Sequence, residues 1–319
     1  MTTRSAVSFA LTALCLFASI GSSTATAQET ETTTLHLGST PAGHPTVVIN
    51  VGEFGPYNLI LDTGASHTAI ALPMAMEVGF TPSETSMSDV QALDTVFVAE
   101  EFQMPTVAVN GHPIGEVHSI VLPAEGEEPL NYMGFLATNA LGVDRYRLDF
   151  GADQLILNSA APEHQDGVFS TERGLIYAEA RIGNRRARIR VMIDTGSPRT
   201  FVNARMRNML PDRGTRITFN TRGVEQVRPT ATRAVTLRSL RVGGACFDTV
   251  PALFANLDIF RSLGWLDEPA IILGMDAMQY LNLVVDRENG IVELSPSSEE
   301  NFCRRPRVQF SGVLTPSMP

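Results

Sequence analysis

One three-residue motif occurs twice in this chain, and the sequence around it is repeated too. Asp62-Thr63-Gly64 recurs as Asp194-Thr195-Gly196, and each copy follows an apolar run that is typical of a buried strand. Gly52 lies ten residues before the first motif, after Ile49-Asn50-Val51, and Gly183 lies eleven before the second, after Ala180-Arg181-Ile182, which predicts a strand, a turn and a second strand in both copies. A repeat in such extended surroundings indicates that one structural unit is present twice.

The two copies stay in register downstream of the motifs. Gly111 follows Asp62 by 49 residues and Gly244 follows Asp194 by 50, and apolar residues then recur at the same offsets of three, six and nine. Further on, Asn131–Phe135 and Ile271–Met275 are matched, which pairs Gly134 with Gly274 at 72 and 80 residues from the respective aspartates. We therefore expect two lobes of one fold.

Both copies are predicted to be mainly β. Short runs of Val, Ile, Leu and Thr alternate with Gly, Pro and Asn, whereas helical spacing is confined to four short segments, near 136–141, 204–210, 257–263 and 276–281. The predicted organisation is a signal peptide at 1–27, an N-terminal lobe at 28–158, a linker at 159–173, a C-terminal lobe at 174–295 and a tail at 296–319.

The first 27 residues are typical of a signal peptide. Arg4 and the amino group precede the apolar stretch Ala6–Ile20, and Ala25-Thr26-Ala27 offers small residues for cleavage. We expect a secreted or periplasmic mature chain without a transmembrane segment, because no later run approaches 18 apolar residues.

Removal of the signal peptide would leave two cysteines, Cys246 and Cys303. An oxidising compartment favours a disulfide between them that ties down the tail, and two unpaired thiols are the alternative.

The net charge of -10 argues against a nucleic-acid partner, because such a chain repels a phosphate backbone. Residues 28–144 contain fifteen acidic side chains and no Lys or Arg. We interpret this asymmetry as surface composition, and the alternative is steering of cationic substrates.

The repeated motif resembles a known family. An apolar run into Asp62-Thr63-Gly64-Ala65-Ser66 or Asp194-Thr195-Gly196-Ser197, with two apolar residues and Gly downstream, is similar to a lobe of the retropepsin and pepsin type of aspartic protease. The resemblance covers nearly all of the mature chain. It implies two tandem aspartic-protease-like β-barrels with a few short helices and an active-site cleft between the lobes. In that family the Gly-containing strand lies behind the catalytic loop.

Two carboxyls side by side explain why this motif would be duplicated. Amide hydrolysis needs a base to activate water and an acid to protonate the substrate, and two close carboxyls cannot comfortably both ionise. Asp62 and Asp194 are the catalytic candidates, and one chain would supply both, so that a monomer suffices. No metal or other cofactor is expected, and the histidines at 36, 44, 112, 118 and 164 show no metal-ligand spacing.

The resemblance also assigns supporting roles. The hydroxyls of Thr63 and Thr195 would reach across to the opposite loop, and Ser197 resembles the hydroxyl that hydrogen-bonds a catalytic carboxylate. Glycine leaves room for the backbone to approach the carboxylates. The expected supporting residues are Thr63, Gly64, Ala65, Ser66, Gly134, Thr195, Gly196, Ser197 and Gly274.

Some features depart from the family pattern. The candidate flaps are Ser86–Phe102, which contains neither the Tyr of a pepsin flap nor a Gly, and Phe219–Pro229, where Arg222-Gly223-Val224 is closer to a retropepsin flap. The second copy is seven residues longer around Leu257–Trp265, and we interpret Trp265 as a local core anchor rather than part of a binding surface.

The sequence therefore predicts an aspartic endopeptidase that binds an extended protein or peptide substrate. One alternative is a catalytically silent peptide-binding protein on the same scaffold. A second is a glycoside hydrolase, whose two carboxyls would have to be at least about 5 Å apart.

Overall fold

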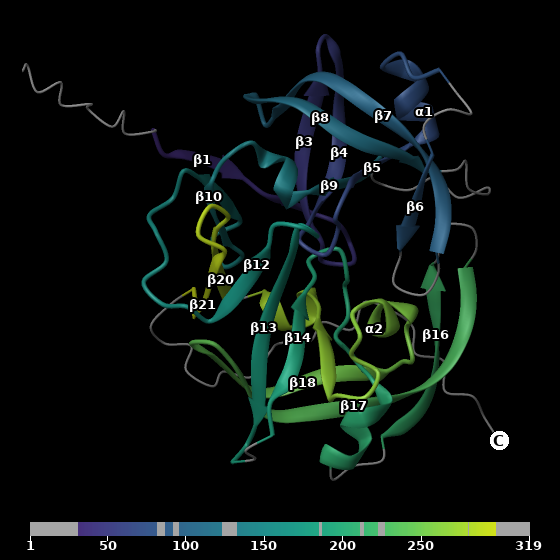
Figure 1. Cartoon of the computed structure of the whole chain (residues 1–319), viewed down its shortest axis with the longest axis vertical. Coiled ribbons are helices and arrows are strands. Elements are labelled where there is room, and N and C mark those ends of the chain that lie inside the picture. Colours follow the sequence, from purple (N-terminus) through teal and green to yellow (C-terminus); the bar gives the residue numbers. More distant parts are fainter. Residues whose placement is uncertain are drawn as a thin grey trace, which may run out of the picture. The chain divides into compact units, whose positions relative to one another are not determined.

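The computed structural model describes residues 31–81, 87–91, 96–122, 133–184, 187–210, 214–222, 227–279 and 281–297. The chain is mainly β in this part, as the sequence predicts (Figure 1). The expected signal peptide, 1–27, lies outside the described residues, and so does the expected tail beyond residue 297.

The first lobe contains a closed barrel of six strands. In pairing order they are β3 (Pro45–Val51), β4 (Phe54–Asp62), β9 (Gly134–Ala137), β5 (Thr68–Ala71), β8 (His112–Leu122) and β7 (Val96–Val109). The ring closes because β7 also pairs with β3, where Ile49 lies opposite Val109. β2 (Gly38–Ser39) adds to β3, and β6 (Met87–Gln91) forms a hairpin with β7.

The second lobe repeats this barrel. In the same pairing order its strands are β13 (Leu175–Ile182), β14 (Ile189–Ile193), β19 (Ala270–Leu273), β15 (Phe201–Val202), β18 (Ala245–Phe254) and β17 (Val227–Val242). The ring closes between β13 and β17, and β16 (Thr215–Arg222) forms a hairpin with β17. Corresponding pairs are parallel or antiparallel alike, which confirms two tandem lobes of one fold.

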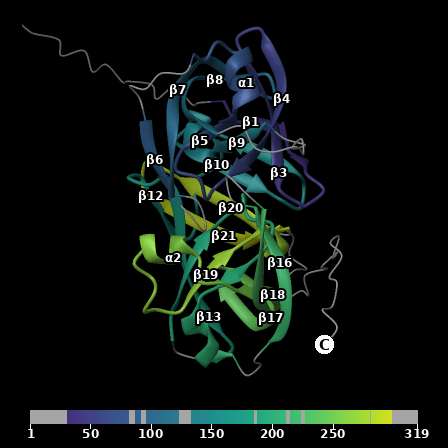
Figure 2. The same cartoon turned by 90° about the vertical axis from the view of Figure 1, so that its right-hand side faces the viewer.

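A row of six strands joins the lobes and continues into the second barrel, because β12 (Gly167–Ser170) also pairs with β13. Its order is β1 (Thr33–His36), β11 (Gln154–Leu157), β10 (Arg145–Asp149), β20 (Leu281–Asp286), β21 (Ile291–Pro296) and β12. The lobes meet where β10 pairs with β20, and Arg147 lies opposite Val284 there. Figures 1 and 2 show β12 beside β21. β12 lies in the expected linker, yet it pairs with β21 as β1 pairs with β11, so it is the counterpart of β1 in the second repeat.

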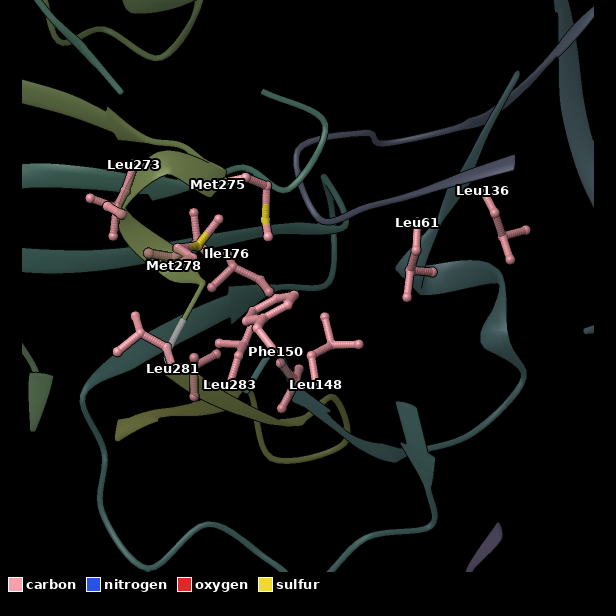
Figure 3. Packing of buried hydrophobic residues seen from close by; sticks show 14 of the residues in the cluster. Leu61, Leu136, Leu148, Phe150, Ile176, Leu273, Met275, Met278, Leu281 and Leu283 are labelled. Carbon is pink, nitrogen blue, oxygen red and sulfur yellow. The ribbon is translucent and has the colours of Figure 1, made fainter. Parts of the chain in front are cut away.

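Alternating apolar side chains fill the barrels. In β3, Val47, Ile49 and Val51 point inward and are buried, while the residues between them are partly exposed, as the period of a strand requires. One buried apolar cluster runs through both lobes and the sheet that joins them. Figure 3 shows part of it, where Leu148 and Leu283 face each other across the β10–β20 pair. Burial of this shared cluster favours association of the lobes.

The helices are all short. They are α1 (Leu72–Glu77), the 3₁₀ turns η1 (Thr138–Leu141) and η2 (Ala204–Met209), α2 (Asp258–Ser262) and α3 (Met275–Met278). Four of them fall at the segments with helical spacing. α1 was not expected, because six residues are fewer than two turns and give apolar periodicity little to repeat. Its one local signal is Pro73 in the first turn, a position that tolerates proline.

Cys246 lies near the start of β18 and is disulfide-bonded. Its expected partner, Cys303, lies outside the described residues, so the identity of the pair stays a prediction.

We expect the mature protein, unfolded without reductant, to show no free thiol in a thiol-counting assay. Cys303→Ser should then expose one thiol and lower the free energy of unfolding by about 2 to 4 kcal/mol, the usual contribution of a disulfide that closes a loop of this kind. Two free thiols in the wild-type protein, or a disulfide between two chains on a non-reducing gel, would contradict the Cys246–Cys303 pairing.

Candidate active site

Two loops of equal length carry the repeated motif. The first runs from Asp62, at the end of β4, to Thr68, at the start of β5, and the second runs from Asp194 to Thr200 between β14 and β15. β9 lies between β4 and β5, parallel to β4, and β19 lies between β14 and β15 in the same way. Each loop therefore crosses over the end of an inserted strand, as the resemblance implies.

The strand registers correct the expected match between Gly134 and Gly274. Asp62 pairs with Ala137, and Gly274 holds the equivalent place beside Asp194, one residue beyond the Ile193–Leu273 pair. Gly134 corresponds to Ile271 instead, because Gly134 pairs with Ile70 as Ile271 pairs with Val202.

Both glycines are nevertheless required by close packing. A Cβ on Gly134 would lie 2.1 Å from the Ala69 carbonyl oxygen, and one on Gly274 would lie 2.4 Å from the Arg199 carbonyl oxygen. Each position therefore requires glycine because of a different backbone carbonyl oxygen. The match between Gly134 and Gly274 was wrong because it rested only on the shared residue type.

Four buried hydrogen bonds between Thr63 and Thr195 and their loops join the lobes. The Thr63 hydroxyl donates to the Ile193 carbonyl oxygen at 2.9 Å, and the Thr195 hydroxyl donates to the Leu61 carbonyl oxygen at 2.6 Å. Each hydroxyl also accepts from the other threonine's backbone N–H, at 2.9 Å and 3.1 Å. Both threonines are fully buried, so these bonds are made without competition from water. The arrangement is the one that the resemblance implies.

These four hydrogen bonds, which we call the threonine lock, hold the two aspartates close to each other. Both are buried, and their side chains hydrogen-bond each other. Each carboxyl lies against the glycine of the other loop: a Cβ on Gly196 would lie 2.2 Å from Oδ2 of Asp62, and one on Gly64 would lie 2.5 Å from Oδ1 of Asp194. Any side chain at either glycine would therefore displace a carboxyl.

Burial raises the pKa of both carboxyls. The pKa of Asp62 rises to about 6, although backbone N–H groups of Gly64, Gly196 and Ala65 favour its ionised form. The Gly64 N–H donates to Oδ1 at 2.7 Å. The pKa of Asp194 lies well above its usual range, because of burial first and the charge of Asp62 second. Such a pair keeps one proton between its members where an exposed carboxyl would be ionised.

The expected hydroxyl contact to the carboxyls is absent from the described bonds. Ser197 is buried, but its Oγ donates to the Arg199 carbonyl oxygen at 2.8 Å, and its backbone N–H donates to the backbone carbonyl oxygen of Asp194 at 3.3 Å. The expectation drawn from the family for this side chain is therefore corrected. Ser66 is exposed and its Oγ lies 2.9 Å from Nδ1 of His67.

A layer of polar residues that was not predicted from the sequence lies behind the loops. Oγ1 of Thr68 accepts from Ala137 N–H, and Oγ1 of Thr200 accepts from Gly274 N–H, both at 3.2 Å. Thr200 also donates to Oδ1 of Asp276 at 2.7 Å, and burial raises the pKa of Asp276 to about 6. The signal was present, since both threonines lie six residues after an aspartate.

The candidate flaps form hairpins. β6 pairs with β7 and β16 pairs with β17, while the tips at 92–95 and 223–226 lie outside the described residues. The first hairpin is linked to the second lobe, because the Ser262 hydroxyl in α2 donates to Oε1 of Gln91 at 2.5 Å. Trp265 packs against a small apolar cluster of the second lobe, with its ring centre 5.5 Å from that of Tyr177, which agrees with a core anchor.

The described residues contain no group of three or more His, Cys, Asp and Glu side chains placed to hold a metal ion. No helix in that part of the chain has the length and apolar character needed to cross a membrane.

Comparison with known proteins finds the same repeat. Residues 45–144 and 178–277 each match the family model described as aspartyl protease, and together the two matches cover more than half of the chain. Both segments contain one Asp-Thr-Gly loop and the strand inserted behind it. No curated protein matches the chain.

The raised pKa of Asp62 makes stability depend on pH. From about pH 4 to pH 6 the folded state holds a proton that the unfolded chain has released, so the free energy of unfolding falls as pH rises through that window. Asn resembles the protonated carboxyl. We expect Asp62→Asn to be more stable than wild type at pH 7 by on the order of 1 to 3 kcal/mol, and nearly equal to it at pH 4.

Urea unfolding at both pH values measures this difference. Asp153→Asn, at an exposed turn residue, is the matched control and should change stability little at either pH. A gain for Asp62→Asn that is equal at pH 4 and pH 7 would show that the proton of Asp62 does not cause it.

Proposed function

Because the chain belongs to the aspartyl protease family, we propose that it is an aspartic endopeptidase whose catalytic groups are Asp62 and Asp194. The observation that carries the proposal is the pair of buried, hydrogen-bonded carboxyls with raised pKa values at the meeting point of the two loops. One ionised and one protonated carboxyl supply a base and an acid at the same place.

The reaction needs no covalent intermediate. The ionised carboxyl takes a proton from water as the water oxygen attacks the peptide carbonyl carbon, while the protonated carboxyl donates to the carbonyl oxygen. The carboxyl that took a proton from water then gives it to the leaving nitrogen, while the other carboxyl takes a hydroxyl proton from the tetrahedral intermediate. The C–N bond breaks, and the pair is again singly protonated. The Gly64, Gly196 and Ala65 N–H groups at Asp62 support the ionised state through which this cycle passes.

An extended peptide is the proposed substrate. Such a peptide can hydrogen-bond to an edge of a hairpin and place alternate side chains in pockets. The β6–β7 hairpin offers exposed apolar side chains for this purpose, since Met87, Val96 and Val98 are all at least half exposed. A single chain contributes both aspartates, so a monomer suffices for one site.

We propose a location outside the cytoplasm, in the periplasm or secreted. Support comes from the signal-like segment at 1–27 and from the disulfide at Cys246, since disulfides persist mainly in oxidising compartments.

The carboxyl geometry disfavours glycoside hydrolysis. Two carboxyls that hydrogen-bond each other leave no room for a sugar between them, whereas that reaction needs a separation of at least about 5 Å. A catalytically silent peptide-binding protein would keep the same fold, and only an activity assay separates it from the enzyme.

The proposal is tested by incubating the mature protein with a peptide mixture from pH 3 to pH 7, with and without a statine-type inhibitor. Inhibitor-sensitive cleavage supports the endopeptidase. Inhibitor binding without cleavage at any of these pH values would point to the silent binding protein instead.

Substitution of either aspartate tests the pair itself. Asp62→Asn and Asp194→Asn should each abolish cleavage, because each leaves the pair without its acid–base partner, and both variants should stay folded by circular dichroism. Mixing the two folded variants should not restore activity, because each chain still lacks one carboxyl. Recovery on mixing would show that aspartates pair between chains, and full activity of either variant would refute the mechanism.

A further inference from the structure

Each barrel carries a small apolar cluster on the face from which its aspartate emerges. Phe135 pairs with Ile60 in the first lobe, and Ile272 pairs with Met192 in the second. Ile60 and Met192 each lie two residues before an aspartate, so their side chains leave the strand on the same side as the carboxyl. Phe135 and Ile272 belong to clusters that are separate from the core inside the barrels.

The strand registers match the two clusters residue by residue. Each has at its centre a residue of β5 or β15 with its two pairing partners, namely Ala69, Phe135 and Ile120 in the first lobe and Phe201, Ile272 and Leu253 in the second. We call these sets the aspartate-side clusters. Ala69 is matched by Phe201, so the second lobe fills more of this face with its own strand.

Different parts of the chain cover the two clusters. In the first lobe the cover is the β6–β7 hairpin, which contributes Val90, Phe97 and Ala99. In the second lobe it is the segment around α2, which contributes Leu257, Ile259, Phe260, Leu263 and Trp265. A hairpin that is a candidate flap thus covers one cluster, and a short helix covers the other.

The exposure of the residues beside the aspartates differs accordingly. Ile272 and Phe260 are both 0% exposed, whereas Phe135, the counterpart of Ile272, keeps part of its surface exposed. Leu253 is also partly exposed, but it lies on β18, which two strands separate from β14 and Asp194. The first lobe therefore offers apolar surface beside its aspartate, and the second lobe has filled that place.

The α2 segment is an addition to the repeat. With Gly134 matched to Ile271, fourteen residues, 256–269, take the place of ten, 123–132, in the first lobe. The first-lobe segment lies outside the described residues, and its sequence contains three glutamates, one leucine and one tyrosine. The second contains six large apolar residues. The apolar cover is thus specific to the second lobe.

Hydrogen bonds fix the α2 segment to the second lobe. The buried side chain of Asn203 donates to the Trp265 carbonyl oxygen at 2.9 Å and to the Glu268 carbonyl oxygen at 2.7 Å. The Trp265 N–H donates to the Phe260 carbonyl oxygen at 2.8 Å. A cover held by a buried amide is part of the lobe and does not open as a flap does.

We propose that the α2 segment, 257–265, determines specificity by occupying the place that a substrate side chain would take on the second lobe. A peptide cleaved at the carboxyl pair extends over both lobes, since each lobe contributes one carboxyl. Its side chain on the first-lobe side meets Phe135, and its side chain on the other side meets a surface filled by Phe260. The enzyme consequently selects an apolar residue on one side of the cleaved bond only. The inference rests on the proposed peptidase function.

Phe260→Ala tests this role. Removal of the ring leaves an apolar space beside Ile272 that a substrate side chain can enter. On peptides varied at the two residues that flank the cleaved bond, we expect wild type to favour Phe or Leu over Ala on the order of 10-fold in kcat/KM at one position, and to discriminate less than about threefold at the other. Phe260→Ala should show a preference on the order of 10-fold at both positions.

Phe247→Ala is the matched control. Phe247 is also buried in the second lobe, but it belongs to the core inside the barrel. This variant should lose stability to a similar extent and keep the wild-type preference. Leu263→Ala, at a partly buried residue of the same cover, should shift the preference in the same direction as Phe260→Ala and replaces it if that variant does not fold.

Ala69→Phe is the reciprocal change. It gives the first lobe the residue that the second lobe has at the matched position, so it should weaken the preference that wild type shows. The inference would be overturned by an equal wild-type preference at both positions, by unchanged profiles in the folded cover variants, or by the same gain in Phe247→Ala.

Binding of statine-type peptides separates this inference from the proposed function. With Phe or Ala placed on either side of the statine, wild type should discriminate at one side only, and Phe260→Ala at both. If no peptide is cleaved but this pattern holds, the proposed function fails and the role of the α2 segment stands. Cleavage together with equal discrimination at both sides in wild type refutes that role in an active enzyme. If neither protein binds or cleaves any of the peptides, both proposals fail.

Discussion

The reciprocal threonine bonds are the contact on which the candidate site depends. Thr63 and Thr195 each donate a hydroxyl proton into the opposite loop and accept a backbone N–H from it. All these groups are buried, so separating the loops by even a small distance would leave several of them without partners, at a cost of roughly 1 to 3 kcal/mol each. The shared sheet and apolar cluster hold the lobes together more broadly, but the threonines set the spacing of the two loops.

The spacing of the two loops determines how the two carboxyls ionise. With the loops locked, Asp62 and Asp194 meet across Gly64 and Gly196, where only a missing Cβ leaves room for a carboxyl. Burial and mutual repulsion then oppose ionisation, while the surrounding N–H groups favour it. The balance leaves a pair that holds one proton in water near neutral pH. Neither lobe alone could produce it, since each contributes only one carboxyl and one facing glycine.

The repeat in the sequence predicted the two lobes, the paired aspartates and the threonine lock, because these depend on short-range motifs in register. Other features depend on contacts that the sequence does not display. Gly134 was matched to Gly274 because both lack a side chain, although different carbonyl oxygens exclude one. The Ser197 hydroxyl is directed by the turn around Pro198 to a backbone oxygen rather than to Asp194.

A duplicated chain can treat its two carboxyls differently, which two identical subunits related by symmetry cannot do. The loops and the residues behind them have diverged at matched positions, with Ala65 against Ser197 in the loops and Asn139 against Asp276 behind them. Asn139 donates a hydrogen bond to the Ser66 carbonyl oxygen of the first loop, whereas Asp276 accepts one from Thr200 of the second. The side chain behind the first loop is therefore a donor, and the one behind the second loop is an acceptor. The pKa of Asp62 and the pKa of Asp194 depend on different neighbouring residues. Substitutions can therefore change the pKa of one carboxyl while the reciprocal threonine hydrogen bonds, which both carboxyls require, stay the same.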